Sequence, residues 1–298
     1  MPAHVTVMAH AGAPLAPHDL WGAWSLEPAV LLGLAVVGVG YGRGVRRLWC
    51  AGSRVVTGRQ VAAFAAGLAV LALALLSPLD ALAEVLFTAH MAQHMLLVMV
   101  AAPLLVLGAP GLPLTVALMP GWRRRLALLR RHAAVVAGRR LLSRPMVAWA
   151  VHVGVLWAWH LPVPYQAALA DELVHAAEHA SFLGSAVLFW WVLARRRLAP
   201  GFAILYLFAA GLQGSALGAL LTLAPAPLYP LQAAGSAPWG LPPLADQQLA
   251  GLVMWVPADL TYLGAAAALF IRWLTSMEGR DPRHEQAAQP PASIPRAG

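Results

Sequence analysis

The chain has 298 residues, of which 60% are apolar and 11% are charged, whereas a typical soluble domain has about 25% charged residues. This composition excludes ordinary soluble domains and indicates an integral membrane protein. The net charge is +8 and all 20 basic residues are arginine. The positions of the arginines therefore indicate whether the positive charge would bind nucleic acid or anionic lipid headgroups. The single cysteine, Cys50, excludes an internal disulfide and a CxxC site.

Seven apolar stretches follow one another along the chain, and most are near the roughly 20 residues that a helix needs to cross a bilayer. They cover residues 28–41, 60–79, 85–108, 146–162, 173–193, 201–223 and 248–273. The first is short, and we expect it to extend to Trp21 on one side or to Trp49 on the other. The alternating pattern of barrel strands is absent, so the sequence predicts an all-α, polytopic membrane protein, a bundle of seven transmembrane helices.

Every arginine lies after the first, third or fifth stretch, or at or beyond the end of the seventh. They are Arg43, Arg46, Arg47, Arg54, Arg59, Arg123, Arg124, Arg125, Arg130, Arg131, Arg139, Arg140, Arg144, Arg195, Arg196, Arg197, Arg272, Arg280, Arg283 and Arg296. By the positive-inside rule, the N-terminus lies outside and the C-terminus lies in the cytoplasm. The basic residues then face anionic lipid headgroups, and nucleic acid is not expected as a partner. In the Arg-rich cytoplasmic loop at about 109–145, residues 121–142 are expected to lie on the membrane surface as one amphipathic helix.

The two ends of the chain differ from the middle. Residues 1–27 lack a basic start and a continuous apolar run, so we expect an extracytoplasmic tail and not a signal peptide. Its His4, Met8, His10 and His18 could capture copper outside the membrane, but an ordinary solvated tail is the favoured expectation. Residues 28–275 form the predicted transmembrane domain, and the proline-rich residues 276–298 are expected to be a disordered cytoplasmic tail.

Five histidines and a glutamate fall at one predicted depth, near the outer ends of three stretches. These are His90 and His94 in the third, His160 in the fourth, and His175, Glu178 and His179 in the fifth. Histidines four residues apart project from the same helical face, so each pair can hold one ion between two imidazoles. Ionisable groups within a membrane are costly, and this many at one depth indicate a shared site.

The residues around these histidines favour copper. Met91, Met95 and Met99 alternate with the first pair, and thioether with imidazole, in the absence of thiolate, favours copper, especially Cu(I), over a structural zinc site. Glu178 is expected to join the ligands or to orient an imidazole.

His152 and Asp259 also lie within the apolar stretches. His152 is expected to be a hydrogen-bonded helix contact. Asp259 is expected to be neutral or bonded to a neighbour such as His152 or Gln213.

The same residues allow other classes of function. His175 to His179 reads HAAEH, which matches the H-x-x-E-H signature of inverted zinc metallopeptidases and allows a membrane-embedded zinc hydrolase. Histidines on two helices also allow haem binding or handling. A transporter is less favoured, because few polar residues lie below the predicted outer leaflet.

Several runs resemble the multi-spanning CtaG family of cytochrome c oxidase assembly factors. They are SPLD from Ser77, HMAQHMLLVMVAAPLLVLGAP from His90, WHLPVPYQAAL from Trp159, HAAEHASFLGSAVLFWWVL from His175 and DQQLAGLVMWVPADLTYL from Asp246. The likeness covers about residues 77–273 apart from the arginine-rich loop. The resemblance implies a bacterial plasma-membrane protein that helps to form an active haem-copper oxidase, with copper delivery as its role.

The combined prediction is a metal site that opens toward the outer face and transfers copper without catalysis. The metal ligands expected are His90, His94, His175 and His179, with His160, Met91 or Met95 completing or relaying the coordination and Glu178 sharing the charge. The ion would pass by ligand exchange to an oxidase subunit in the same membrane.

Overall fold

A computed structural model describes residues 15–195, 198–233 and 235–278. These residues form helices and contain no strand. The elements, in chain order, are η1 (Leu20–Gly22), α1 (Pro28–Cys50), α2 (Gly58–Leu76), α3 (Pro78–Val85), α4 (Phe87–Met95), the π-helical η2 (Leu96–Ala101), α5 (Ala102–Leu107), α6 (Gly111–Ala117), α7 (Pro120–Arg131), α8 (Ala133–Leu142), α9 (Pro145–Trp159), α10 (Pro162–Ala170), α11 (Glu172–Ala194), α12 (Pro200–Leu223), α13 (Pro230–Ala233), η3 (Ala237–Trp239) and α14 (Pro243–Glu278).

Within the described residues, six helical spans are long and apolar enough to cross a membrane: α1, α2, the continuous run from α4 through α5, α11, α12 and α14. A seventh results if α8 and α9 are joined, although they meet at an angle of 77°. The all-α membrane class is therefore confirmed. The fourth predicted span, residues 146–162, is shorter than expected, because α9 ends at Trp159 and Pro162 begins α10 after a turn.

Other boundaries also differ from the prediction. Helix α1 extends on its C-terminal side, to Cys50, and not back to Trp21. The second span ends at Leu76, because Ser77 caps a new helix with Pro78 at its first position. The seventh helix is longer than predicted and runs through to Glu278.

The arginine-rich segment at 121–142 does not form one amphipathic helix. It folds as two, α7 and α8, separated at His132, whose extended backbone ends the first helix and begins the second. Neither helix has a buried residue. This segment is anchored instead through α6, where the guanidinium of Arg47 donates to the carbonyls of Val116 at 2.7 Å and Ala117 at 3.0 Å.

The run from α4 through η2 to α5 is the central span of the bundle. It packs against α14 on one side, α11 on another and α2 on a third, and half of its apolar window is buried. The π-helical segment lies directly before Pro103, which has no N–H to donate to the preceding turn. The Trp190 indole of α11 donates to the carbonyl of Val98 at 3.1 Å, which ties the widened turn to its neighbour.

The first backbone N–H groups of helix α4 donate hydrogen bonds to a buried carboxylate. Asp246 of α14, 2% exposed, accepts from the N–H of Phe87 at 2.7 Å and of Thr88 at 3.0 Å. The Thr88 hydroxyl also donates to this carboxylate at 2.6 Å. A carboxylate at this position satisfies orphan helix donors and faces the positive end of the helix dipole. It therefore fixes the height and rotation of α4 relative to α14.

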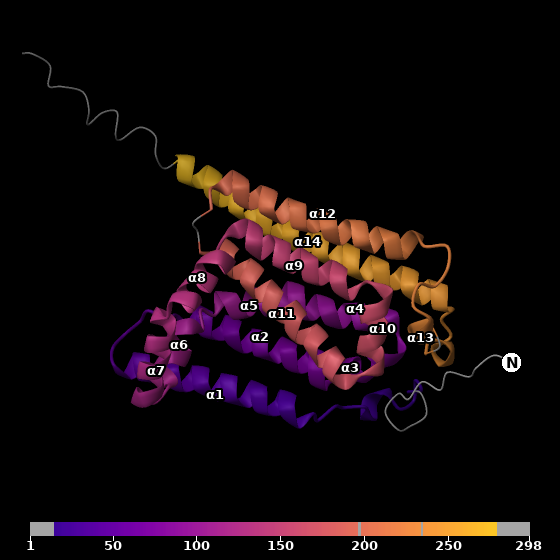
Figure 1. The fold of residues 1–298 in the computed structure, drawn as a ribbon, viewed down its shortest axis with the longest axis horizontal. Coiled ribbons are helices and arrows are strands. Elements are labelled where there is room, and N and C mark those ends of the chain that lie inside the picture. Colours follow the sequence, from indigo (N-terminus) through magenta and orange to yellow (C-terminus); the bar gives the residue numbers. More distant parts are fainter. Residues whose placement is uncertain (1–14, 196–197, 234, 279–298) are drawn as a thin grey trace, which may run out of the picture.

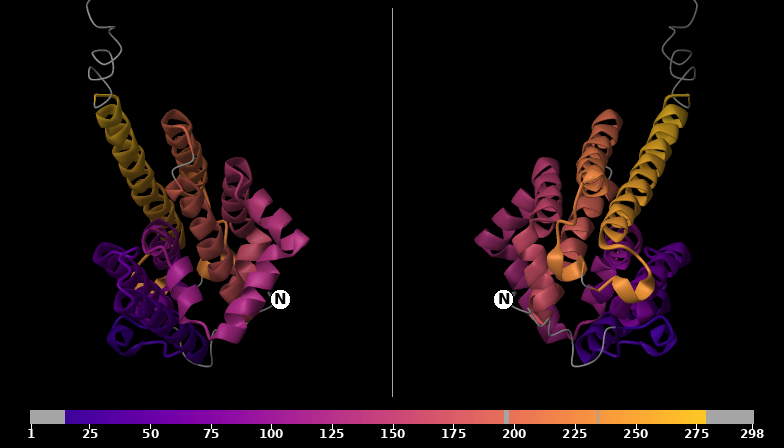
Figure 2. Two further views of the ribbon diagram at one scale, coloured as in Figure 1. Left: turned by 90° about the vertical axis from the view of Figure 1, so that its left-hand side faces the viewer. Right: turned by 90° about the vertical axis from the view of Figure 1, so that its right-hand side faces the viewer.

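Helices α12 and α14 approach each other closely through glycine. A Cβ at Gly251 would lie 2.4 Å from the Thr222 hydroxyl, and one at Gly218 would lie 2.8 Å from Trp255 Cβ. Small residues allow such approach between membrane helices. Figure 2 shows this pair rising away from the first helices of the chain.

The two ends of the bundle carry different chemistry (Figure 1). One end, here called the arginine end, holds the C-terminal part of α1 together with α6, α7 and α8. The other, the histidine end, holds α3, α10, α13 and the starts of α4 and α11. The orientation of these ends in a membrane stays a prediction from the arginines.

The described part of the N-terminal tail contacts the histidine end. The Trp239 indole donates to the carbonyl of Leu15 at 3.0 Å, and the N–H of Ser25 donates to Leu76 at 3.1 Å. His18 is exposed and lies 3.4 Å from Asp19. The predictions for His4, Met8 and His10, and for most of the C-terminal tail at 279–298, fall outside the described residues.

Replacing Asp246 by alanine is predicted to destabilise the protein. The change removes the cap of α4 and leaves buried amides unpaired, so thermal unfolding in detergent should show a loss of about 1–2 kcal/mol. Asp19→Ala, which removes an exposed carboxylate at the same end, serves as the control. An unfolding temperature equal to that of the parent for Asp246→Ala would show that the cap contributes little.

Candidate metal centre

Four imidazoles meet between the first turns of α4 and α11. Within α4 the ring centroids of His90 and His94 are 4.3 Å apart, and within α11 those of His175 and His179 are 4.2 Å apart. Across the two helices, His90 lies 5.6 Å from His175, and His94 lies 5.3 Å from His179. The two four-residue spacings are thus turned toward each other, as the sequence predicts.

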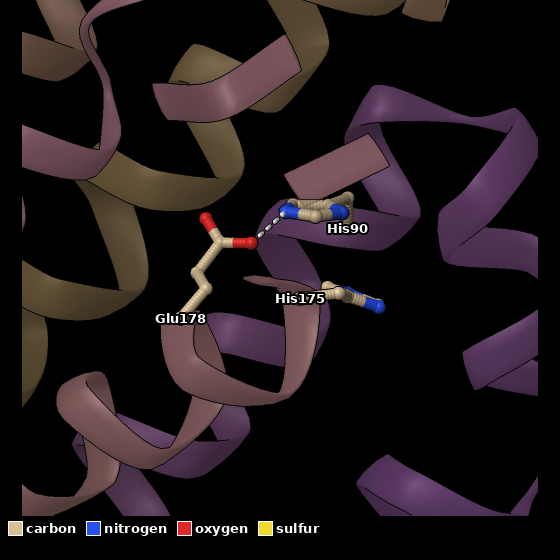
Figure 3. A group of neighbouring side chains, drawn as sticks. All are labelled: His90, His175 and Glu178. Carbon is tan, nitrogen blue, oxygen red and sulfur yellow. Dashed lines mark ion pairs between the residues drawn. The ribbon is translucent and has the colours of Figure 1, made fainter. Parts of the chain in front are cut away.

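Glu178 places a carboxylate against this group. Its two oxygens lie 3.7 Å from Nε2 of His90 and 3.9 Å from Nε2 of His94. Figure 3 shows the carboxylate directed at the His90 ring, with the His175 ring beside it. One ligand atom from each of His90, His175 and Glu178 can be chosen so that all lie within 4.8 Å of one another. Three donors this close can converge on a single ion.

The inner part of the site is fully buried and lacks hydrogen-bond partners. His90, His94 and Glu178 are 0%, 1% and 1% exposed. Neither ring nitrogen of His90 or His94 forms a hydrogen bond with a described residue, and Nε2 of His179 also forms none. A buried polar atom without a partner costs roughly 1–3 kcal/mol. Imidazole nitrogens that converge on a carboxylate without bonding each other fit a cation as their common partner.

His160 and Met91 lie next to the four imidazoles and form a pair of lone-pair donors. Nδ1 of His160 is 2.7 Å from the carbonyl of Leu156, which can only accept, so Nδ1 carries the hydrogen. In the neutral ring, Nε2 then presents its lone pair to the sulfur of Met91, 3.4 Å away. Met95 is also buried, one turn further along α4.

Aromatic residues enclose the site. The Tyr165 ring of α10 lies 5.2 Å from that of His90, and the Phe182 ring lies 4.5 Å from that of His94. Burial raises the pKa of Tyr165 well above its usual value, and the nearby Glu178 raises it further. The phenol therefore stays neutral and acts as a wall and not as a charged ligand.

Sequence reasoning did not identify the residues that position α4. Gln93, fully buried between the two histidines, donates to the carbonyl of Ala74 at 2.8 Å and to Asp80 at 2.7 Å. These bonds hold α4 against α2 and α3, while Asp246 holds its start. An amide within an apolar helix is the one signal that marks Gln93, and nothing local connects Asp246 to a helix start 159 residues away.

A cavity of about 650 Å³ leads to the histidines of α11. His175 and His179 line it, together with four carboxylates on the tail, α3 and α11. The carboxylates are Glu27, Asp80, Glu84 and Glu172. We call this cavity the acidic vestibule. No arginine among the described residues lines it, so its charge attracts cations.

His152 and Asp259 lie away from this centre. His152 is a helix contact, as predicted: its nitrogens lie 3.3 Å from Ser185 and 3.3 Å from Tyr262. Asp259 is bonded to neighbouring side chains, as predicted, although not to the two named as examples. It accepts from Ser215 at 2.7 Å and from Trp255 at 2.8 Å, because these residues face it from α12 and from the preceding turn.

These features define a polytopic helical membrane protein with a buried cluster of histidines at one end. Residues 39–276 match the family described as cytochrome c oxidase caa3 assembly factor, Caa3_CtaG, and the chain belongs to this family. The resemblance seen in the sequence is confirmed.

The chain is also similar to three curated proteins from mycobacteria. An uncharacterized protein of Mycobacterium leprae is 29% identical over 271 residues, which are 84% of this chain and 39% of that protein. Uncharacterized proteins of Mycobacterium bovis and Mycobacterium tuberculosis are each 27% identical over 277 residues, 88% of this chain and 41% of theirs. The chain thus spans 39% to 41% of the length of these relatives. No solved structure matches it.

Replacing Glu178 by glutamine is predicted to weaken metal binding without abolishing it. The amide keeps the shape of the side chain but removes the negative charge beside the imidazoles, so affinity for Cu(I) should fall about tenfold. Competition with a chromophoric chelator measures the change. The matched control is Asp19→Asn, at an exposed position that does not line the vestibule, and equal affinity in both variants would contradict a role for the Glu178 charge.

Proposed function

We propose that this protein helps to assemble a haem-copper cytochrome c oxidase by binding copper at its histidine end and passing it to the oxidase. The observation that carries the proposal is the convergence of four imidazoles and a carboxylate in a buried space. Membership of the assembly-factor family supplies the biological setting.

The donor set suits copper as a cargo held for a short time. Imidazole nitrogens and thioether sulfurs bind copper well, and the absence of thiolate leaves the site adaptable. Three of the candidate ligand atoms lie within 4.8 Å of one another, close enough to share one ion. Imidazole and thioether ligands without a thiolate allow release of the ion by ligand exchange.

The acidic vestibule provides the approach. Its carboxylates raise the local concentration of cations, and its wall includes His175 and His179, which would be the first imidazoles that an arriving ion meets. From there, the fully buried His90 and His94 of α4 and Glu178 of α11 lie further inward. If the N-terminus lies outside, the vestibule opens on the outer face of the bacterial plasma membrane.

The geometry favours copper transfer over the two alternatives. In a zinc hydrolase Glu178 would act on a water, but its carboxylate lies among the imidazoles and forms part of the ligand group. For haem, ring centroids 4.2 to 5.6 Å apart leave no space for a porphyrin between the imidazoles in this arrangement. A compact ion fits this spacing, and transfer of an ion requires no catalysis.

The partner is an oxidase subunit in the same membrane, which would meet the bundle sideways at its histidine end. The exposed arginines of α7 and α8 would hold the opposite end at anionic lipid headgroups.

Removing the four imidazoles is predicted to abolish copper binding. Detergent-purified protein, loaded with Cu(I) under reducing conditions and desalted, should retain copper, whereas the variant with His90, His94, His175 and His179 changed to alanine should retain none. His132→Ala, at an exposed histidine between α7 and α8, is the control. A Soret band in the purified protein would favour the haem class. Equal amounts of copper in the parent and in the four-histidine variant would contradict copper binding by these four histidines.

In cells, the same variant is predicted to fail in oxidase assembly. A strain that lacks the gene should recover cytochrome c oxidase activity with the parent and with His132→Ala, but not with the four-histidine variant at equal protein level. In the strain with the four-histidine variant, excess copper in the medium should restore part of the oxidase activity, because a high copper concentration lets the oxidase bind copper without a delivery protein. Full activity with the four-histidine variant would refute copper delivery through these residues.

A further inference from the structure

A small, largely apolar cavity lies next to the imidazoles, and methionines form part of its wall. Its volume is about 20 Å³, which is room for one water-sized species. Four methionines line it: Met91, Met95, Met99 and Met254. We call this space the methionine chamber.

The chamber is joined to the candidate metal centre by two histidines. His94 and His160 belong to both, since they line the chamber and lie beside the other imidazoles. Neither nitrogen of His94 has a hydrogen-bond partner among the described residues. His160 directs Nε2 at the sulfur of Met91. Two lone-pair donors that face each other at 3.4 Å cannot bond each other in the neutral state, and a soft cation near both satisfies them.

The chamber differs from the upper site in charge. Glu178 lies among the upper imidazoles, 3.9 Å from His94 at the boundary of the chamber, whereas no acidic residue is among the described residues that line the chamber itself. Its lower wall contains His152 and Tyr262, which already bond each other at 3.3 Å. Every donor available to an ion in the chamber is therefore neutral.

A neutral, buried site distinguishes ions by charge and softness. The desolvation penalty grows with the square of the charge, so it is about four times as large for a divalent ion as for a monovalent one. Thioethers bind Cu(I) far better than they bind Zn(II). The upper site, with its carboxylate, compensates a divalent charge, and the chamber does not.

We propose that the methionine chamber is a second metal position, selective for monovalent soft ions, which receives Cu(I) from the four imidazoles through His94 and His160. The inference rests on the proposed function, since the ion has to reach the imidazoles first. It adds Met99 and Met254 to the residues that handle copper. It also gives the protein a means of rejecting Zn(II) after the first binding step.

The test compares Ag(I), a stable monovalent soft ion, with Zn(II) and Cu(I) on the full chain in detergent. The parent is expected to retain about two Ag(I) but about one Zn(II) per chain after desalting. In the variant with Met95, Met99 and Met254 changed to leucine, which has a similar volume, Ag(I) should fall about twofold while Zn(II) is unchanged. The control variant, with the exposed Met119 and Met146 changed to leucine, should behave as the parent.

X-ray absorption at the copper edge gives a second measurement. Parent protein labelled with selenomethionine and loaded with Cu(I) should show more selenium neighbours per copper than the labelled triple-leucine variant, which keeps Met91. Equal numbers of selenium neighbours, with equal Ag(I) in the parent and the triple-leucine variant, would overturn the chamber and leave the imidazole site intact. Absence of any bound metal in the parent would overturn the chamber together with the proposed function. Retained Zn(II) in the triple-leucine variant shows that it is folded.

Discussion

The arrangement of the histidine end depends on one buried carboxylate at the start of one helix. Asp246 of α14 receives the first amides of α4, and those amides have no intrahelical partner. Because α4 also carries His90 and His94, the same contact sets the depth and rotation of half of the candidate metal centre. Gln93 completes the constraint from the opposite side through Ala74 and Asp80. The histidines are thus held by their helix and by its neighbours, and their nitrogens remain available.

A second constraint comes from the negative charge of a buried carboxylate, that of Glu178. Glu178 is 1% exposed, and a buried carboxylate is costly unless a positive group compensates it. Its nearest described basic neighbours are the imidazoles of His90 and His94, at 3.7 and 3.9 Å. A cation among these groups would offset the carboxylate and would also be the missing partner of the imidazoles. The same reasoning separates this site from the methionine chamber, for which we propose a singly charged, soft ion.

The predictions from sequence succeeded where a pattern is local and failed where a boundary depends on packing. Apolar length identified the spans of α2, α11 and α12 closely, and the four-residue histidine spacings identified the faces of α4 and α11 that meet. Proline and capping decided the failures. Pro162 shortens the fourth span, and the backbone at His132 divides the expected surface helix into two. Asp259 is hydrogen-bonded as predicted, but its partners differ from the two examples, because they depend on which residues of α12 face α14, and apolar periodicity does not determine that.

The sequence by itself determined the membrane class, the helical state, the separation of arginine from histidine and the residues of the candidate site. It did so because each of these follows from composition or from spacing along a single helix. Only the tertiary structure decided that the two histidine pairs lie 5.3 to 5.6 Å apart, that Glu178 lies among them, and that four carboxylates from distant segments line one vestibule. These features depend on how helices separated by many residues rotate and approach, which is set by buried contacts such as that of Asp246 with Phe87, 159 positions apart.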